Sequence, residues 1–161
     1  MRVPAPAFAL VVLAAGCAGA PPRPAPAVPP AALPAPAVAA ALGARAASLA
    51  SHYLGTPYRT GGASPGGFDC SGLVYYVYRT LGVAVPRTAA EQRAATRRVS
   101  AEALLPGDLV FFSTPEDHVG IYVGDGEFVH APGTGRGVER ARLDAPYFIL
   151  GFAGGGRVGG S

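Results

Sequence analysis

The sequence contains no lysine, and all 13 of its basic residues are arginine. Together with 10 acidic residues they give a net charge of +3 at pH 7, which is too small and too scattered for a nucleic-acid-binding surface. The chain also lacks an apolar run of the roughly 20 residues that a transmembrane helix needs. The composition therefore argues against a nucleic-acid-binding protein and against a polytopic membrane protein.

Aromatic residues are absent between Phe8 and Tyr53, and proline and alanine dominate the chain before residue 40. A packed core is therefore expected only in the C-terminal two thirds of the chain. A length of 161 residues fits one domain with appendages better than two full domains.

The first 16 residues are typical of a secretory signal peptide, with one positive charge, a short apolar segment and small residues at the end. The segment Leu13-Ala14-Ala15-Gly16-Cys17 resembles a bacterial lipobox, although that pattern usually has leucine where Ala14 stands. In this interpretation Cys17 is lipidated and anchors the protein stably to a membrane. The alternative is an ordinary signal peptide, cleaved near Ala18 or Ala20, which would give a secreted protein.

Residues 17–37 are rich in proline and alanine. Proline fixes φ and donates no hydrogen bond, so this segment predicts an extended polyproline-II tether, with disordered low-complexity sequence as the alternative. We expect a folded domain at residues 38–155 and a flexible tail at 156–161.

Within the expected folded domain, the sequence predicts helices first and strands afterwards. Helices are expected at 38–54, at 70–81 and from a capping box at Thr88 and Glu91 to about residue 97. Short strands are expected at 109–113, 118–123, 127–131, 137–141 and 147–153. This order predicts an α+β fold in which the helices pack on an antiparallel sheet of about five strands.

The turn around Asp125-Gly126 determines the register of one hairpin. A two-residue turn would place Ile121 opposite His130 and mix polar with apolar side chains on one face. A three-residue loop, with Gly126 in a left-handed bulge, instead pairs Ile121 with Val129. We therefore predict the three-residue loop.

The same register pairs Val119 with Ala131 and places His130 opposite Gly120. His118 then lies diagonal to His130 on the same face of the sheet. The glycine is expected to leave room for the two rings.

Cys70 stands at the start of a predicted helix, where unpaired N–H groups and a partial positive charge stabilise a thiolate. A nucleophilic thiol also needs a base, for which His118 is the candidate, and His130 is placed to orient that base. The three residues alone leave other interpretations open: an inert buried thiol, a disulfide to Cys17, or a zinc site. The zinc site lacks the paired C-x-x-C spacing of structural sites.

Several motifs, in order and with compatible spacing over about residues 45–153, resemble the NlpC/P60 family of cell-wall peptidases. They are Gly55-Thr56-Pro57-Tyr58-Arg59-Thr60-Gly61-Gly62, Phe68-Asp69-Cys70-Ser71-Gly72-Leu73-Val74, Pro86-Arg87-Thr88, Gln92, Pro106-Gly107-Asp108-Leu109-Val110-Phe111-Phe112, His118-Val119-Gly120-Ile121-Tyr122 and Val129-His130-Ala131.

The resemblance implies a papain-like fold with Cys70 as nucleophile, His118 as base and His130 as third member, and with no metal or cofactor. It also implies that the hydroxyl of Tyr58 supports the oxyanion, and that Asp69 and Ser71 contact the free amino end of a stem peptide. Tyr58 could instead simply pack, and Asp69 could serve as a helix N-cap.

The implied activity is hydrolysis of an amide bond in the peptidoglycan stem peptide, commonly the D-γ-glutamyl-diaminopimelate bond or a related crosslink bond. The implied location is the periplasmic side of the cell envelope, with the lipid on Cys17 in the outer membrane. The alternatives are a thiol amidase or acyltransferase acting on another envelope substrate, and a non-catalytic wall-binding scaffold.

Overall fold

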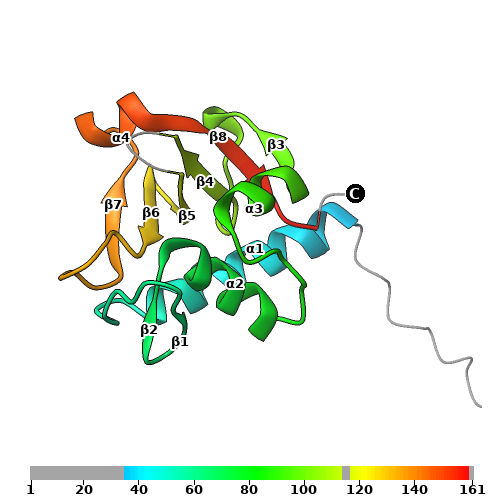
Figure 1. Ribbon diagram of the computed structural model, residues 1–161. Coiled ribbons are helices and arrows are strands. Elements are labelled where there is room, and N and C mark those ends of the chain that lie inside the picture. Colours follow the sequence, from blue (N-terminus) through cyan, green and yellow to red (C-terminus); the bar gives the residue numbers. More distant parts are fainter. Residues whose placement is uncertain (1–34, 114–116, 160–161) are drawn as a thin grey trace, which may run out of the picture. The chain divides into compact units, whose positions relative to one another are not determined.

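The computed structural model describes residues 35–113 and 117–159 (Figure 1). The predicted signal peptide, Cys17 and nearly all of the predicted tether lie outside these residues. Within them, no helix is both long and apolar enough to cross a membrane. The elements are α1 (Ala35–His52), β1 (Ala63–Ser64), β2 (Gly67–Phe68), α2 (Cys70–Thr80), α3 (Ala89–Ala95), β3 (Arg97–Val99), the 3-10 turn η1 (Ala101–Ala103), β4 (Leu109–Phe112), β5 (His118–Gly124), β6 (Glu127–His130), β7 (Glu139–Arg142), α4 (Pro146–Gly151) and β8 (Phe152–Arg157).

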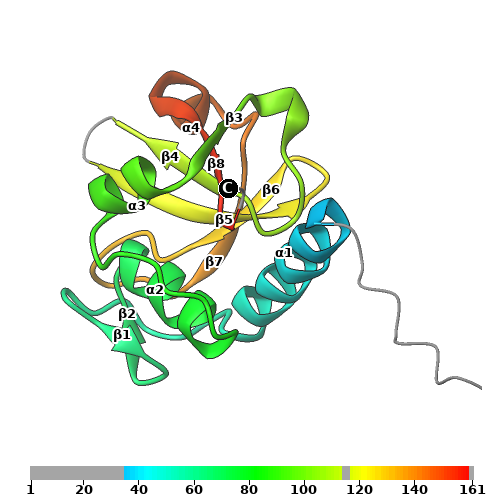
Figure 2. The same cartoon turned by 90° about the vertical axis from the view of Figure 1, so that its right-hand side faces the viewer.

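The main sheet has six antiparallel strands in the order β3-β8-β4-β5-β6-β7. Helices α1 and α2 lie on the same side of this sheet (Figures 1 and 2), and both contact β5. The predicted α+β architecture is confirmed, with one strand more than expected because the sequence did not predict β3, a charged strand of three residues.

Strand β4 is buried on both faces, and its side chains alternate between two apolar clusters. Leu109 and Phe111 belong to the cluster under α1 and α2, which includes Leu73, Val77 and Ile121. The other two side chains of β4 belong to a smaller cluster on the opposite face, which also involves α4 and β8. Because β4 is buried on both faces and pairs with β5, it fixes the position of β5, the strand that carries His118.

The β5–β6 hairpin has the predicted register, because Ile121 pairs with Val129. The predicted three-residue loop is wrong. Gly124 pairs with Glu127, and the turn consists of Asp125 and Gly126, with φ values of 53° and 76°, as a type I′ turn requires. The extra residue is accommodated inside β5, where the register shifts between Tyr122 and Gly124.

Gly120 makes room for a different ring than expected. A Cβ atom at this position would lie 2.5 Å from the Phe128 ring, so the absence of a side chain admits Phe128 rather than the histidine rings.

The C-terminal part corrects two predictions. Of the strand predicted at 147–153, residues 147–151 are helical, because Pro146 begins the helix α4, and β8 starts only at Phe152. The expected tail at 156–161 also begins too early: Gly156 pairs with Leu109, and Arg157 forms an ion pair with Asp108. Three consecutive glycines disfavour a strand by propensity, but Gly155 and Gly156 lie where a Cβ would collide with neighbouring atoms.

Candidate active site

Cys70 is the first residue of α2, and the loop before it is held tightly. Asp69 is the N-cap of α2, and its carboxylate accepts a hydrogen bond of 2.7 Å from the N–H of Gly72. The N–H of Asp69 donates to the carbonyl of Gly62 at 3.0 Å. A Cβ at Gly72 would lie 1.9 Å from that carbonyl oxygen. Only glycine therefore lets the two segments approach this closely, and their contact fixes the backbone on both sides of Cys70.

The thiol of Cys70 is partly buried and lies next to the start of β5. Burial raises its pKa, an effect that the N–H of Val119 opposes, while the charge of Asp69 raises the pKa further. Val119 directly follows His118, so the thiol lies close to the backbone of the histidine that the sequence assigned as its base.

The two histidines predicted to meet do so. Nε2 of His118 lies 2.8 Å from Nδ1 of His130, and their rings are nearly perpendicular. His130 is 2% exposed and packs against the rings of Phe128 and Phe148. Burial lowers the pKa of His118 to about 4, and burial together with His118 and Arg136 lowers the pKa of His130 to about 3. Both imidazoles are therefore neutral at pH 7.

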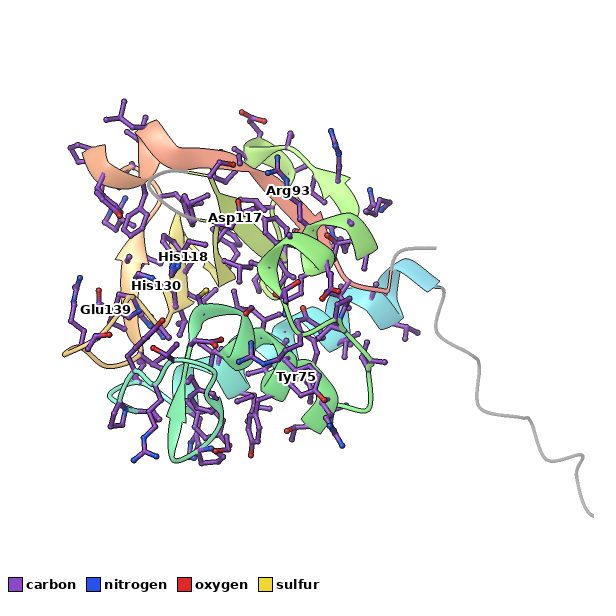
Figure 3. All side chains as sticks on the ribbon, in the orientation of Figure 1. Tyr75, Arg93, Asp117, His118, His130 and Glu139 are labelled. Carbon is purple, nitrogen blue, oxygen red and sulfur yellow. The ribbon has the colours of Figure 1, made fainter. Side chains whose placement is uncertain are left out.

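Glu139, which sequence analysis missed, continues this row. It lies directly opposite His130 in the β6–β7 register, with Oε1 3.6 Å from Nε2 of His130. Figure 3 shows the side chains of His118, His130 and Glu139 following one another. Arg136 donates to the same carboxylate. Glu139 lies inside the strand predicted at 137–141, but the sequence pattern did not indicate which residue of β6 it would face.

Arg87 is a second residue whose place the sequence did not indicate. Its guanidinium donates to both carboxylate oxygens of Asp69, at 2.9 and 2.6 Å, and to Oγ of Ser71 at 2.9 Å. Burial by itself would raise the pKa of Asp69, but the hydrogen bonds from Arg87 and Gly72 lower it below its usual value. The two side chains that flank Cys70 are therefore both bound to one arginine.

Gln92 joins α3 to the same region from within the core. The residue is fully buried, and its Nε2 donates to the carbonyls of Ser71 and Pro86 at 3.0 and 2.8 Å. The predicted capping box at the start of α3 is present. Together these contacts fix the loop that carries Arg87 against the start of α2.

Tyr58 lies beside the segment that leads to Cys70. It forms a bridge with Phe68 in β2, its N–H donates to the carbonyl of Arg136 at 2.9 Å, and its ring contacts the core under α1 and α2. Its hydroxyl has no hydrogen-bond partner among residues 35–113 and 117–159. This position is compatible both with a packing role and with a hydroxyl that is available near the site.

A shallow hollow lies at His118, lined by Ala89, Ala90, Arg93, Phe111, Phe112, Asp117 and His118. A larger cavity of about 300 Å³ lies elsewhere, between α1 and β8, and none of the predicted site residues lines it. Across the described residues, no three His, Cys, Asp or Glu side chains are grouped as a metal site requires.

A family model for NlpC/P60 matches residues 55–155, a range that contains every side chain of this site. The chain belongs to the NlpC/P60 family. The resemblance inferred from the motifs is thereby confirmed, while helix α1 lies outside the matched range of the NlpC/P60 domain.

Individual relatives agree with this assignment. The chain is 45% identical over 113 residues to murein DD-endopeptidase MepH of Escherichia coli, covering 65% of this chain and 42% of the relative. It is 42% identical over 92 residues to a γ-D-glutamyl-L-lysine dipeptidyl-peptidase of Bacillus subtilis, covering 54% and 31%. The chain thus spans less than half the length of these two relatives.

The NlpC/P60 fold also matches solved structures. The crystal structure of an NlpC/P60 family protein from Bacillus cereus superposes with a TM-score of 0.69 at 35% identity, covering 72% of this chain and 40% of that one.

Proposed function

We propose that this NlpC/P60 domain is a cysteine peptidase that hydrolyses an amide bond in the peptidoglycan stem peptide. The observation that carries the proposal is a thiol at a helix N-terminus, next to the N–H of the residue that follows His118, together with the neutral, hydrogen-bonded imidazoles of His118 and His130. Support for the substrate class comes from relatives named as a murein endopeptidase and as a γ-D-glutamyl-L-lysine dipeptidyl-peptidase.

In the proposed reaction His118 takes the proton of the Cys70 thiol as the sulfur attacks the amide carbonyl. The carbon–sulfur bond forms, and the oxyanion is held by the N–H of Cys70 and the hydroxyl of Tyr58. His118 then protonates the amine nitrogen as the carbon–nitrogen bond breaks. A water molecule, deprotonated by His118, attacks the thioester, releases the acid, and the proton returns to the sulfur.

The helix N-terminus and the burial of the thiol act in opposite directions. The N–H groups at the start of α2 favour the thiolate, whereas burial favours the neutral thiol. Because burial also keeps His118 neutral, proton transfer from sulfur to nitrogen is expected to accompany the attack rather than to precede it.

The scissile bond is proposed to be D-γ-glutamyl-diaminopimelate, with Asp69 and Ser71 near the free amino end of the stem peptide. Arg87 already binds both of these side chains, so an incoming ammonium would meet a carboxylate that is largely neutralised. This arrangement favours hydrogen bonding over full charge pairing at the amino end.

Purified stem peptides test which bond the protein cleaves. The full chain is incubated with a tripeptide that contains the D-γ-glutamyl-diaminopimelate bond and, separately, with a crosslinked dimer, and the products are identified by mass spectrometry. The proposal expects cleavage of the tripeptide between glutamate and diaminopimelate. Cleavage of the dimer crosslink alone would contradict the proposed scissile bond. If the folded protein cleaves neither peptide, the proposed peptidase activity is contradicted.

We further propose, from the sequence alone, that Cys17 carries a lipid that anchors the protein on the periplasmic side of the outer membrane. The expected mature protein starts at Cys17 and has the added mass of its acyl chains. A mature N-terminus beyond Cys17, without added mass, would instead identify a secreted protein.

A further inference from the structure

The relation between His118, His130 and Glu139 bears on which nitrogen of each ring carries a proton. His118 approaches His130 through Nε2, and His130 receives it at Nδ1. One of these two nitrogens must donate and the other accept, so the tautomers of the two rings are coupled. If His118 is to accept the thiol proton at Nδ1, its Nε2 must carry hydrogen and the Nδ1 of His130 must be the acceptor.

That requirement leaves the single hydrogen of neutral His130 on Nε2. This nitrogen is buried and has no hydrogen-bond partner within the described part of the chain. Oε1 of Glu139 lies 3.6 Å from it. This carboxylate attracts a positively polarised N–H and would repel the lone pair of the other tautomer. A carboxylate in this place therefore favours the tautomer that makes His118 a base toward Cys70.

We propose that Glu139 is a positioning residue, which acts through His130 to keep Nδ1 of His118 free of hydrogen. The inference rests on the proposed function, with Cys70 as nucleophile, and adds to it a fourth residue in the row.

The surroundings hold Glu139 in place for this role. Its backbone lies opposite His130 in the β6–β7 ladder, and Arg136 binds its carboxylate. The neighbouring Val138 exchanges two backbone hydrogen bonds of 2.8 Å with the segment at Gly55 and Thr56. Arg136 also opposes a positive charge on His130, so the carboxylate orients the neutral ring instead of forming an ion pair with it.

The test measures the tautomers directly, in protein without substrate. The three histidines give separate ring-nitrogen signals in ¹⁵N NMR, and His52→Gln identifies the signals of the third ring. At pH 7 the expected wild-type spectrum shows hydrogen on Nε2 of both His118 and His130. Hydrogen on Nδ1 of His130 would overturn the proposal, and this measurement requires neither substrate nor a variant at Glu139.

Variants at Glu139 supply the second part of the test. Glu139→Gln keeps the shape but offers an amide that can donate to Nε2, so part of His130 is expected to switch to the Nδ1–H tautomer. We expect kcat to fall roughly tenfold or more with little change in KM, because the substrate site is untouched. Glu139→Asp, which keeps a carboxylate, is expected to retain the wild-type tautomer.

Glu127→Gln is the matched control, because Glu127 lies on β6, is similarly exposed and pairs with Arg140 at 3.3 Å. It is expected to leave tautomers and kcat unchanged. Unchanged tautomers and kcat in Glu139→Gln would overturn the proposal. Because the tautomers are read without substrate, a failure of the proposed peptidase activity remains distinguishable from a failure of this inference.

Discussion

Arg87 binds both carboxylate oxygens of Asp69, the residue that immediately precedes Cys70. The pair is partly buried, with 35% of the arginine side chain and 16% of the aspartate side chain exposed. A carboxylate next to a thiol opposes formation of the thiolate, and a bidentate guanidinium offsets that charge. The arginine therefore links the shape of the nucleophile loop to the reactivity of the thiol.

Removing Arg87 is expected to slow the reaction of the thiol. In Arg87→Gln the charge of Asp69 is no longer offset, so the pKa of Cys70 rises, whereas in Asp69→Asn it falls. The measurement is the pH dependence of iodoacetamide alkylation, followed on the peptide that contains Cys70. Shifts in the same direction in both variants would show that Arg87 acts only by supporting the fold.

The same substitution is expected to lower the free energy of unfolding by about 1–2 kcal/mol, reduced by the partial exposure of Arg87. Urea denaturation measures this change. Arg79→Gln is the matched control, because it removes one positive charge from the far end of α2, where Arg79 donates to Tyr75. A loss in the control as large as that in Arg87→Gln would contradict a specific role for the pair.

The segment that carries the nucleophile was predictable from local patterns. Glycines, the capping aspartate and the apolar spacing after Cys70 all act within a few residues, and these local rules place α2 within one residue at its end. The meeting of His118 and His130 was also predictable, because side-chain alternation selects the register in which Ile121 pairs with Val129.

Arg87 and Glu139 were not predictable in the same way. Each reaches its partner across a loop whose path depends on tertiary packing: Arg87 approaches Asp69 from the segment before α3, and Glu139 approaches His130 after the loop at 131–138. The apolar run in α4 suggested a strand because apolar segments of this length suit either structure. The glycines of β8 form no strand pattern at all.

The close approach of Gly72 to Gly62 gives a second stability prediction. Gly72→Ala places a Cβ 1.9 Å from a backbone carbonyl oxygen, so the N-terminus of α2 must shift. We expect a loss of about 1–3 kcal/mol in the free energy of unfolding and slower alkylation of Cys70.

Gly66→Ala is the control for this substitution, since its Cβ would find Ser64 Oγ at 3.9 Å and no nearer atom. Equal stability of the two variants would contradict the tight contact between the two segments.

The hairpin turn predicts the behaviour of Gly126. Its φ of 76° is poorly tolerated by a β-branched residue, so Gly126→Val is expected to lower the free energy of unfolding by about 1–3 kcal/mol. Gly126→Asn should be much less harmful, because asparagine adopts this conformation more readily. An unchanged melting temperature in Gly126→Val would contradict the left-handed conformation of Gly126 in this turn.

The buried histidines make stability depend on pH. In the unfolded chain histidine has a pKa near 6.5, whereas burial lowers the pKa of His118 to about 4 and that of His130 to about 3. As the pH falls below 6.5, the unfolded state binds protons that the folded state does not, so stability falls. Above 6.5 both states are neutral and the contribution vanishes.

The expected loss between pH 7 and pH 5 is about 2–4 kcal/mol for the two residues together. Urea denaturation at half-unit steps of pH measures it. Asp69, whose pKa is lowered from 3.8, adds its own loss only in more acidic solution. The double variant His118→Gln, His130→Gln should show a flatter dependence, and the same slope in that variant would assign the effect to other groups.

The most direct test of the central claim is digestion of purified peptidoglycan by the full chain and by Cys70→Ala, with the soluble products analysed by mass spectrometry. Circular dichroism first establishes that both proteins are folded. Stem-peptide fragments released by the wild type and absent with Cys70→Ala are the predicted result. Equal release by both proteins, or release by neither, would contradict a Cys70-dependent peptidoglycan peptidase.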